Sequence, residues 1–182
     1  GAYAAAPDCA HLVDDQGHPV DDGEAGELVI RDSTLFKGYW LGAGQIDGAR
    51  KNGWFHTGDI MRKDGNGDLH YVARKKDLII NDGRKVAPAE IEHALLMHPA
   101  VAEVAVVGVQ DLSLGQRIVG FVVLDASCRV APDEILRELA TRLADYKVPE
   151  RLFVVAQIPR NELGKAIRPL LIGRALDLTL NR

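Results

Sequence analysis

Asp59 and Arg74 are the first residues whose types and setting could do chemistry. Asp59 ends the run Thr57-Gly58-Asp59, which we expect at a strand end, where the glycine leaves the backbone free. An exposed carboxylate there can accept two hydrogen bonds from vicinal hydroxyls, as in a ribose. Arg74 follows within reach of the same sheet edge, and its planar guanidinium suits ribose, phosphate or carboxylate. The alternative for a bare Thr-Gly-Asp run is a plain turn with an aspartate cap.

Lys165 and Gly83 are the corresponding candidates in the second half of the chain. Lys165 closes a polar loop, 159–165, that follows a predicted buried strand. A lone lysine on a glycine-bearing loop is a point charge that can move onto a phosphate or a carboxylate; a solvated surface lysine is the alternative. Gly83 lies between Asp82 and Arg84, where a positive φ or a close approach of backbone is expected. An ordinary turn glycine is the alternative there.

Other kinds of site find no support in the sequence. His56 neighbours the aspartate run but has no evident partner, which indicates a structural or surface histidine. No Ser/His/Asp or Cys/His nucleophile pattern, zinc spacing or GxGxxG loop is present, so we expect no metal site. The run 64–68 begins like a calcium-binding EF-hand loop, but Leu69 replaces the required glycine and Lys75 the bidentate glutamate. A hairpin turn is the better interpretation.

Composition describes an ordinary globular chain of 182 residues with a net charge of −4. Two cysteines without metal or redox spacing indicate thiols in a reducing cytoplasm. No apolar run reaches the roughly 20 residues that span a bilayer, and no signal peptide is visible. Positive charge is concentrated in residues 74–85, which contain five basic residues and two acidic ones. This stretch indicates either a local anionic partner or a solvated basic face. The acidic net charge and the few aromatic residues argue against nucleic acid.

The elements that must position these residues fall into two groups. Residues 10–14 and 26–31 are predicted strands, residues 36–40 form an aromatic segment, and Asn52-Gly53 marks a tight turn. A hairpin joins residues 60–61 to 69–72. Short strands with regular turns predict a small β-barrel-like subdomain.

After Lys76 the pattern changes to mixed α and β. Residues 78–80 are a predicted buried strand, Pro88 begins a helix that Pro99 stops, and strands follow at 101–109 and 117–125. A helix beginning at Pro132 has one apolar face, consisting of Ile135, Leu136, Leu139 and Leu143. A strand over 151–158 and a last helix from residue 165 or 166 to about 176 complete a compact α+β domain, a mixed sheet with about three helices.

The motifs occur in an order that closely resembles the later motifs of the AMP-forming adenylate ligases, the superfamily of acyl- and aryl-CoA synthetases, luciferases and peptide-synthetase adenylation domains. The resemblance covers about residues 8–176 and is nearest to the acyl- and aryl-CoA synthetases. Its motifs are Gly26-Glu27-Leu28-Val29-Ile30, Lys37-Gly38-Tyr39-Trp40, Gly53-Trp54-Phe55-His56-Thr57-Gly58-Asp59, Arg74-Lys75-Lys76-Asp77, Gly83 with Pro88-Ala89-Glu90-Ile91-Glu92, Lys147-Val148-Pro149 and Pro159-Arg160-Asn161-Glu162-Leu163-Gly164-Lys165.

The resemblance implies a role for each candidate residue. A carboxylate would attack the α-phosphate of Mg-ATP to give acyl-AMP, and a thiol, usually that of CoA, would then displace AMP. Asp59 would hold the ribose hydroxyls with support from Arg74, and Lys165 would stabilise charge at the α-phosphate and the carboxylate. Lys76 falls at the hinge position, and Gly83 belongs to the loop near the pantetheine thiol after the small domain rotates.

Several departures from the family pattern matter. Ala73 replaces the usual glycine before Arg74, and Asn81-Asp82 replaces small residues before Gly83. The phosphate loop and the segment with the Mg²⁺-binding glutamate, expected upstream, are not in this chain. The resemblance therefore predicts an incomplete distal β subdomain of the large domain over residues 1–73, a hinge over 74–77 and a C-terminal lid domain over 78–182.

Two hypotheses about function follow. In the first, the chain is the C-terminal part of a carboxylate–CoA ligase and is inactive alone, because its carboxylate, ATP and CoA would meet on the missing large domain. In the second, it is a stand-alone binding or regulatory module that keeps the lid fold without chemistry. The acid itself cannot be predicted, because the pocket that selects it would lie upstream.

Overall fold

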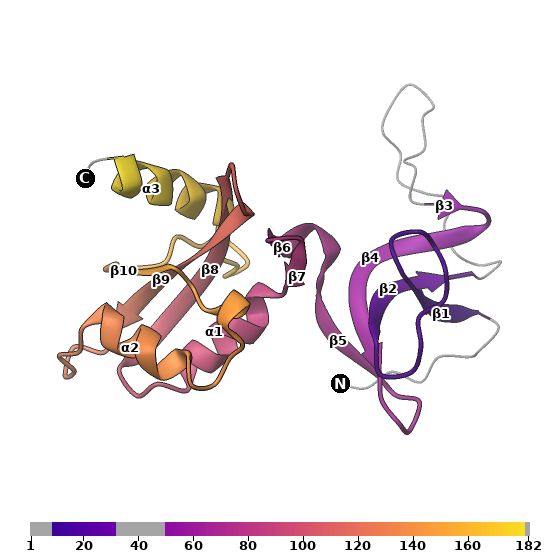
Figure 1. Ribbon diagram of the computed structural model, residues 1–182, viewed down its shortest axis with the longest axis horizontal. Helices are drawn as coiled ribbons and strands as arrows, with labels where there is room; N and C mark the ends of the chain where they lie inside the picture. The colour runs from indigo at the N-terminus through magenta and orange to yellow at the C-terminus, as the bar shows by residue number, and fades with distance from the viewer. Residues whose placement is uncertain (1–8, 32–49, 181–182) are drawn as a thin grey trace. The chain divides into compact units, whose positions relative to one another are not determined.

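The computed structural model describes residues 9–31 and 50–180, and the chain divides into two compact units, Gly1–Asp77 and Leu78–Arg182 (Figure 1). No helix within the described ranges is long and apolar enough to cross a membrane. The predicted α+β class is confirmed: a curled antiparallel sheet forms the first unit, and a mixed sheet with three helices forms the second. Each unit is described by itself below.

The first unit is an antiparallel sheet built around one long strand, β4 (Trp54–Lys63). One edge of β4 pairs with β2 (Ala25–Ile30), which pairs in turn with β1 (Ala10–Val13). The other edge pairs first with β3 (Arg50–Lys51) and then with β5 (Leu69–Arg74). A small core lies between them, formed by Leu12, Met61 and Leu69 with Val20 and Leu28 against them. The predicted small β subdomain is thus confirmed, and the aromatic segment 36–40 lies outside the described residues.

Two turns in this unit follow from their residue types. Asn52 (φ 51°) and Gly53 (φ 84°) both occupy the left-handed region that a two-residue hairpin turn requires, and they join β3 to β4. The loop between β4 and β5 is the predicted hairpin turn. In it, Asp64 Oδ1 accepts hydrogen bonds from the backbone of Asn66 (2.9 Å) and Asp68 (3.0 Å). The carboxylate that suggested calcium therefore holds the turn.

The second unit is a mixed sheet centred on β9 (Gly115–Leu124). Its full length pairs with β8 (Val101–Asp111), and its other edge pairs in parallel with β10 (Arg151–Val154) and in antiparallel fashion with β6 (Ile79–Asn81). A short strand, β7 (Arg84–Val86), completes the sheet beside β6. The helices are α1 (Pro88–Leu96), α2 (Pro132–Leu139) and α3 (Arg168–Leu180).

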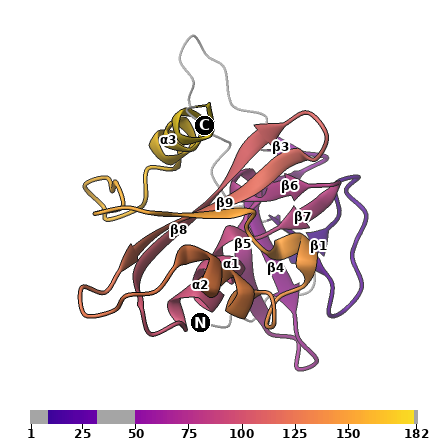
Figure 2. The same ribbon diagram turned by 60° about the vertical axis from the view of Figure 1, so that its left-hand side comes forward.

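Strand alternation divides the core of this unit between the two faces of the sheet. Val106 and Val122 face α1 and α2, whereas Ala105, Val107 and Phe121 face α3. Figures 1 and 2 show α3 on the opposite side of the sheet from α1 and α2. The sheet is therefore covered on both faces, as its run of valines predicts.

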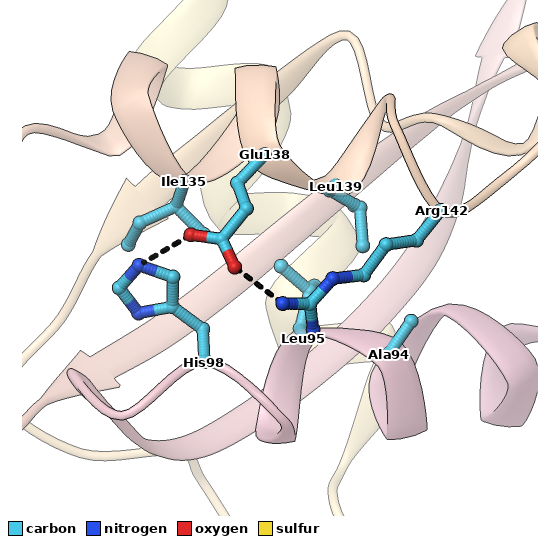
Figure 3. A pocket seen from close by; sticks show the side chains of 7 residues that line it. All are labelled: Ala94, Leu95, His98, Ile135, Glu138, Leu139 and Arg142. Carbon is cyan, nitrogen blue, oxygen red and sulfur yellow. Dashed lines mark hydrogen bonds and ion pairs between the residues drawn. The ribbon is translucent and has the colours of Figure 1, made fainter.

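A polar contact links α1 and α2 at their ends (Figure 3). Glu138 lies between His98 Nε2 (3.3 Å) and Arg142 Nη2 (2.5 Å). His98 Nδ1 accepts the backbone N–H of Ala100 (3.1 Å), so the proton sits on Nε2 and points to Glu138. The space they enclose is about 10 Å³, the lower limit for a single water molecule. This contact joins two helices and has no room for a ligand.

Several element boundaries differ from those predicted. The strand β7 was not predicted, because its Arg84 and Lys85 are exposed and give no apolar alternation. Ile80, predicted to be buried, is 40% exposed because only one face of β6 meets the core. The helix α2 ends at Leu139, although Leu143 still packs on the core from beyond its end.

The last predicted strand and helix are both shorter at their junction than expected. The strand β10 ends at Val154 rather than at residue 158, although Val155 N still donates to Val122 O (2.9 Å). The helix α3 begins at Arg168 rather than at residue 165 or 166, because the backbone of 161–165 bonds within its own loop. Pro169 stands in the first turn of α3, where a proline is tolerated.

Candidate functional site

Residues 57–59 form a bulge in β4 and not the end of a strand, so that part of the prediction is wrong. The pairing of β4 with β2 shifts register between Glu27 and Val29, and β4 then continues to Lys63. Gly58 takes φ +75° inside this bulge, which favours glycine. Bulges bend a strand and redirect its side chains, and they are common beside functional sites. In the sequence, a Thr-Gly-Asp run looks like a strand end because glycine interrupts the alternation of apolar and polar residues. In the structure, pairing with β5 continues the strand from Asp59 to Lys63.

The structure brings Asp59 and Arg74 together across the two strands. They are directly opposite in the β4–β5 ladder, and the Arg74 guanidinium forms an ion pair with Asp59 Oδ1. Arg74 Nη1 also donates to Thr57 O (3.1 Å). The Asp59 side chain is 32% exposed and that of Arg74 is 43% exposed, so both are open to a ligand. A carboxylate has about four lone-pair sites, so Asp59 can accept hydroxyl hydrogen bonds while it keeps the guanidinium.

The buried carboxylate of Glu27, in β2, contacts the bulge through a hydrogen bond. It is 5% exposed and is the only buried charged residue in the described part of the chain. Its Oε1 accepts Gly58 N–H (3.1 Å), and its Oε2 accepts Lys75 Nζ (2.9 Å). Oε2 also lies 3.1 Å from His56 Nδ1, so the expectation that His56 lacks a partner is wrong. Burial of this charge is tolerated because three donors surround it.

The residues that Glu27 binds are chain neighbours of Asp59 and Arg74. Gly58 directly precedes Asp59, and Lys75 directly follows Arg74. One carboxylate thus holds a chain neighbour of each member of the ion pair. The bulge and the end of β5 are fixed together, and so is the exposed pair between them.

Sequence analysis gave Glu27 no role, although a signal was present. Side chains alternate between the two faces of a strand, so Glu27 shares a face with Val29, which is 1% exposed. An acidic residue on the inward face of a strand predicts a buried cationic partner, because an unpaired buried charge is costly.

Charge in this network persists over a wide pH range. Burial raises the pKa of Glu27, but the hydrogen bonds from Lys75 and His56 outweigh burial and hold that pKa below its ordinary value. The hydrogen bond to Glu27 raises the pKa of Lys75, against the opposite effect of partial burial. Glu27 therefore adds stability above about pH 5, which is lost as the pH falls through its lowered pKa. Lys75 adds stability below about pH 10, which is lost as the pH rises through its raised pKa.

We expect Glu27→Gln to lower the free energy of unfolding of the first unit by about 1–3 kcal/mol at pH 7, since an amide cannot pair with the Lys75 ammonium. The loss should be largest between about pH 5 and pH 10 and should shrink toward pH 4. Urea unfolding followed by tryptophan fluorescence measures it, because Trp40 and Trp54, the two tryptophans of the chain, belong to the first unit.

Asp22→Asn is the matched control for this prediction. Asp22 bonds to Lys63 Nζ at 2.8 Å in the same unit but is 73% exposed, so its loss should cost under about 0.5 kcal/mol. Equal effects of the two substitutions, or a loss from Glu27→Gln that does not change from pH 4 to pH 9, would contradict the assignment of a buried charged network.

Lys165 lies on a loop whose backbone is fixed, whereas its side chain is exposed. Asn161 Oδ1 accepts the N–H of Leu163 (3.1 Å) and of Lys165 (2.9 Å), and Asn161 N donates to Lys165 O (2.9 Å). Gly164, at φ +76°, makes the turn possible. Among the described residues the ammonium of Lys165 has no hydrogen bond or ion pair, so it can reach a ligand.

Gly83 and Lys76 both lie in turns. Asp82 (φ 49°) and Gly83 (φ 72°) form the two-residue turn between β6 and β7, so the predicted positive φ is confirmed. A side chain at position 83 would meet open space within 4 Å. Lys76 is exposed in a 3₁₀ turn, Lys75–Asp77, at the end of the first unit.

Within residues 9–31 and 50–180, no group of three or more His, Cys, Asp or Glu side chains could hold a metal ion. The candidate residues instead form two sets. Asp59 and Arg74 are in contact on the first unit, and Gly83 and Lys165 lie on two turns of the second. Their chemistry is that of hydrogen-bond acceptors and fixed positive charge, which suits an anionic, hydroxyl-bearing ligand such as a nucleotide.

The sequence and the fold of this chain are similar to those of known proteins. Residues 90–165 match the family model described as the AMP-binding enzyme C-terminal domain. The chain is 39% identical over 157 residues to a feruloyl-CoA synthase of Amycolatopsis sp, covering 86% of this chain and 32% of the relative. It is 43% identical over 154 residues to a 2-succinylbenzoate–CoA ligase of Geobacillus kaustophilus, covering 84% of this chain and 31% of the relative.

A solved structure agrees with the sequence relatives. ATP-bound MatB from Rhodopseudomonas palustris superposes with a TM-score of 0.82 at 32% identity, covering 93% of this chain and 34% of that chain. The chain spans about a third of the length of the curated relatives it matches. Sequence, fold and the order of the motifs agree: residues 90–165 match the AMP-binding enzyme C-terminal domain, and the chain resembles about a third of the length of the CoA synthase and CoA ligase relatives.

Proposed function

We propose that the chain serves an ATP-dependent, AMP-forming carboxylate–CoA ligase, an acyl-CoA synthetase, in which it supplies part of the nucleotide site and the lid. The observation behind this proposal is the ion pair of Asp59 and Arg74 on the β4 bulge, an exposed acceptor and donor side by side. Relatives named as a feruloyl-CoA synthase and a 2-succinylbenzoate–CoA ligase, at 39% and 43% identity, support the same reaction class.

In this proposal Asp59 accepts hydrogen bonds from the 2′- and 3′-hydroxyls of the ATP ribose. Arg74 keeps the carboxylate oriented through its ion pair and its bond to Thr57 O. Lys165 supplies positive charge where the acid oxygen attacks the α-phosphate. A fixed charge aimed at the developing negative charge lowers the barrier because the protein need not reorganise during the reaction.

Lys76 is the proposed hinge, within residues 74–77, between the adenylating part over 1–73 and the lid domain over 78–182. The division of the chain into compact units after Asp77 supports it. Rotation of the lid domain about this hinge would move Lys165 away from the reacting carbonyl and bring the Gly83 turn there. The turn would then lie along the path of the CoA thiol. A glycine with open space around it leaves room for such an approach.

Mg²⁺ would accompany ATP and neutralise phosphate charge, and we assign its ligands to the part of the ligase upstream of these residues. Nucleotide and CoA phosphates are the proposed partners of the basic stretch 74–85, in preference to nucleic acid. Several of its charges also have partners within the chain: Arg74 pairs with Asp59, Lys75 with Glu27, and Arg84 stacks on Tyr146 at 4.6 Å. The free thiols Cys9 and Cys128 suit a cytoplasmic enzyme.

The proposal predicts that the 182-residue chain alone gives no ATP–pyrophosphate exchange with any acid, since the ATP floor and acid pocket lie elsewhere. The full-length ligase should show exchange with one acid from a panel of arylpropenoic, arylacetic, succinylbenzoic and fatty acids, and should form the CoA thioester of that acid. Exchange by the isolated chain would contradict the inactive-lid assignment. A full-length protein that binds nucleotide without forming acyl-AMP would support the non-catalytic module.

A further inference from the structure

The side chain of Arg160 connects the loop bearing Lys165 to strand β8 of the sheet. Arg160 Nη2 and Nε donate to Glu103 Oε2 at 2.7 and 3.2 Å, and Arg160 Nη1 donates to Gly164 O at 2.8 Å. Gly164 is the residue directly before Lys165. A single guanidinium therefore connects a strand residue, Glu103 of β8, to the backbone that leads into Lys165.

Both ends of this connection are well fixed. Glu103 belongs to β8 and pairs with Val123 of β9, directly after a register shift between Val101 and Glu103, so its backbone is part of the sheet ladder. At the other end, the hydrogen bonds of Asn161 hold the loop, and Arg160 pairs with Ala166 in an isolated bridge. A planar guanidinium can serve two acceptors at once, and that of Arg160 donates both to Glu103 Oε2 and to the Gly164 carbonyl.

We propose that Arg160, together with Glu103, is a positioning residue that fixes the backbone of Lys165 for the adenylation step. This inference rests on the proposed function, in which Lys165 acts on the α-phosphate. With its backbone fixed, the lysine reaches the phosphate through its own side-chain torsions alone. Small displacements of a catalytic group can cost up to about 10²-fold in rate, so the connection is large enough to matter.

A purely structural role for the Arg160–Glu103 pair would look different. Both side chains are 42% exposed, and exposed ion pairs contribute little to stability. We therefore expect the melting temperature of Arg160→Gln to stay within about 3 °C of wild type. A change in the adenylation rate without a change in stability then reports on Lys165.

The test uses the full-length ligase and measures its two half-reactions separately. Arg160→Gln should lower kcat for acyl-adenylate formation about tenfold, with KM for ATP and thioester formation from supplied acyl-adenylate within about twofold of wild type. Glu103→Gln should act in the same direction. Arg142→Gln is the matched control, because Arg142 pairs with Glu138 at 44% and 42% exposure, away from this loop, and it should change neither half-reaction.

A double-mutant cycle decides whether Arg160 acts through Lys165. If it does, Lys165→Ala and Lys165→Ala with Arg160→Gln should form acyl-adenylate at the same rate within about twofold, because the fixed group is already absent. Independent tenfold losses would overturn the proposal, and so would an unchanged rate in Arg160→Gln. If Lys165→Ala itself leaves adenylation unchanged, the proposed function of Lys165 fails instead, and the two failures are thereby distinguished.

Discussion

Lys165→Ala in the full-length ligase is expected to slow acyl-adenylate formation by about 10²- to 10³-fold, the usual cost of removing one group that stabilises transition-state charge. Thioester formation from supplied acyl-adenylate should stay within about threefold, because the proposed rotation of the lid removes Lys165 from the site before the thiol attacks. The substitution should leave the fold unaltered, because the ammonium of Lys165 is exposed and bound to no described residue.

Single-turnover release of pyrophosphate measures the first half-reaction, and CoA consumption with purified acyl-adenylate measures the second. Arg174→Ala, which removes an exposed cation from α3 in the same unit, is the control and should leave both rates unchanged. Lys165→Arg keeps the charge but changes its shape and hydration, so partial recovery would separate charge from geometry. Equal losses in both half-reactions would contradict the proposed role.

Periodicity predicted most elements of the second unit, for reasons visible in particular residues. Pro88 and Pro132 fit only the first turn of a helix, and both stand there. The valine-rich runs of β8 and β9 are buried on both faces, so their lack of alternation is itself informative. The strand β7 escaped prediction because three residues with two exposed cations have no pattern; its pairing with β6 comes from the turn at Asp82 and Gly83.

The candidate residues were predicted by motif order, whereas the groups that hold them were not. Asp59, Arg74 and Lys165 stand in short runs that identify them. Glu27 lies 48 residues from Lys75, and Glu103 lies 57 residues from Arg160, so only the fold shows these contacts. A local motif predicts which group contacts the substrate. The partner that orients it belongs to another strand, and its identity depends on register, which a single sequence leaves open.

Register also explains why Asp59 can be both paired and available. In a regular strand Asp59 would alternate strictly with its neighbours, but the bulge at residues 57–59 releases it from the β2 ladder while the β5 ladder keeps it opposite Arg74. The Thr57 hydroxyl bonds to Leu28 O (2.7 Å) and accepts Asp59 N–H (3.1 Å), which closes the bulge locally. The carboxylate is thereby held in one orientation before a nucleotide arrives, and a preorganised acceptor loses less entropy on binding.

Asp59→Ala should therefore raise KM for ATP by about 10²- to 10⁴-fold in the full-length ligase, because it removes two hydrogen bonds to a charged group, each of which contributes about 1.5–3 kcal/mol. Asp21→Ala, an exposed acid of the same unit, is the control and should have no effect. Tryptophan fluorescence should show both variants folded.

The decisive comparison uses 2′,3′-dideoxy-ATP, which lacks the hydroxyls that Asp59 is proposed to accept. Wild-type enzyme should discriminate against this analogue by about the factor that Asp59→Ala loses with ATP, whereas the variant should treat the two nucleotides alike, since each change removes the same hydrogen bonds. If Asp59→Ala still prefers ATP over the dideoxy analogue as strongly as wild type does, the ribose is read by another group. Asp59 would then act only as the partner that orients Arg74, and the phosphate end of the nucleotide would have to account for the affinity.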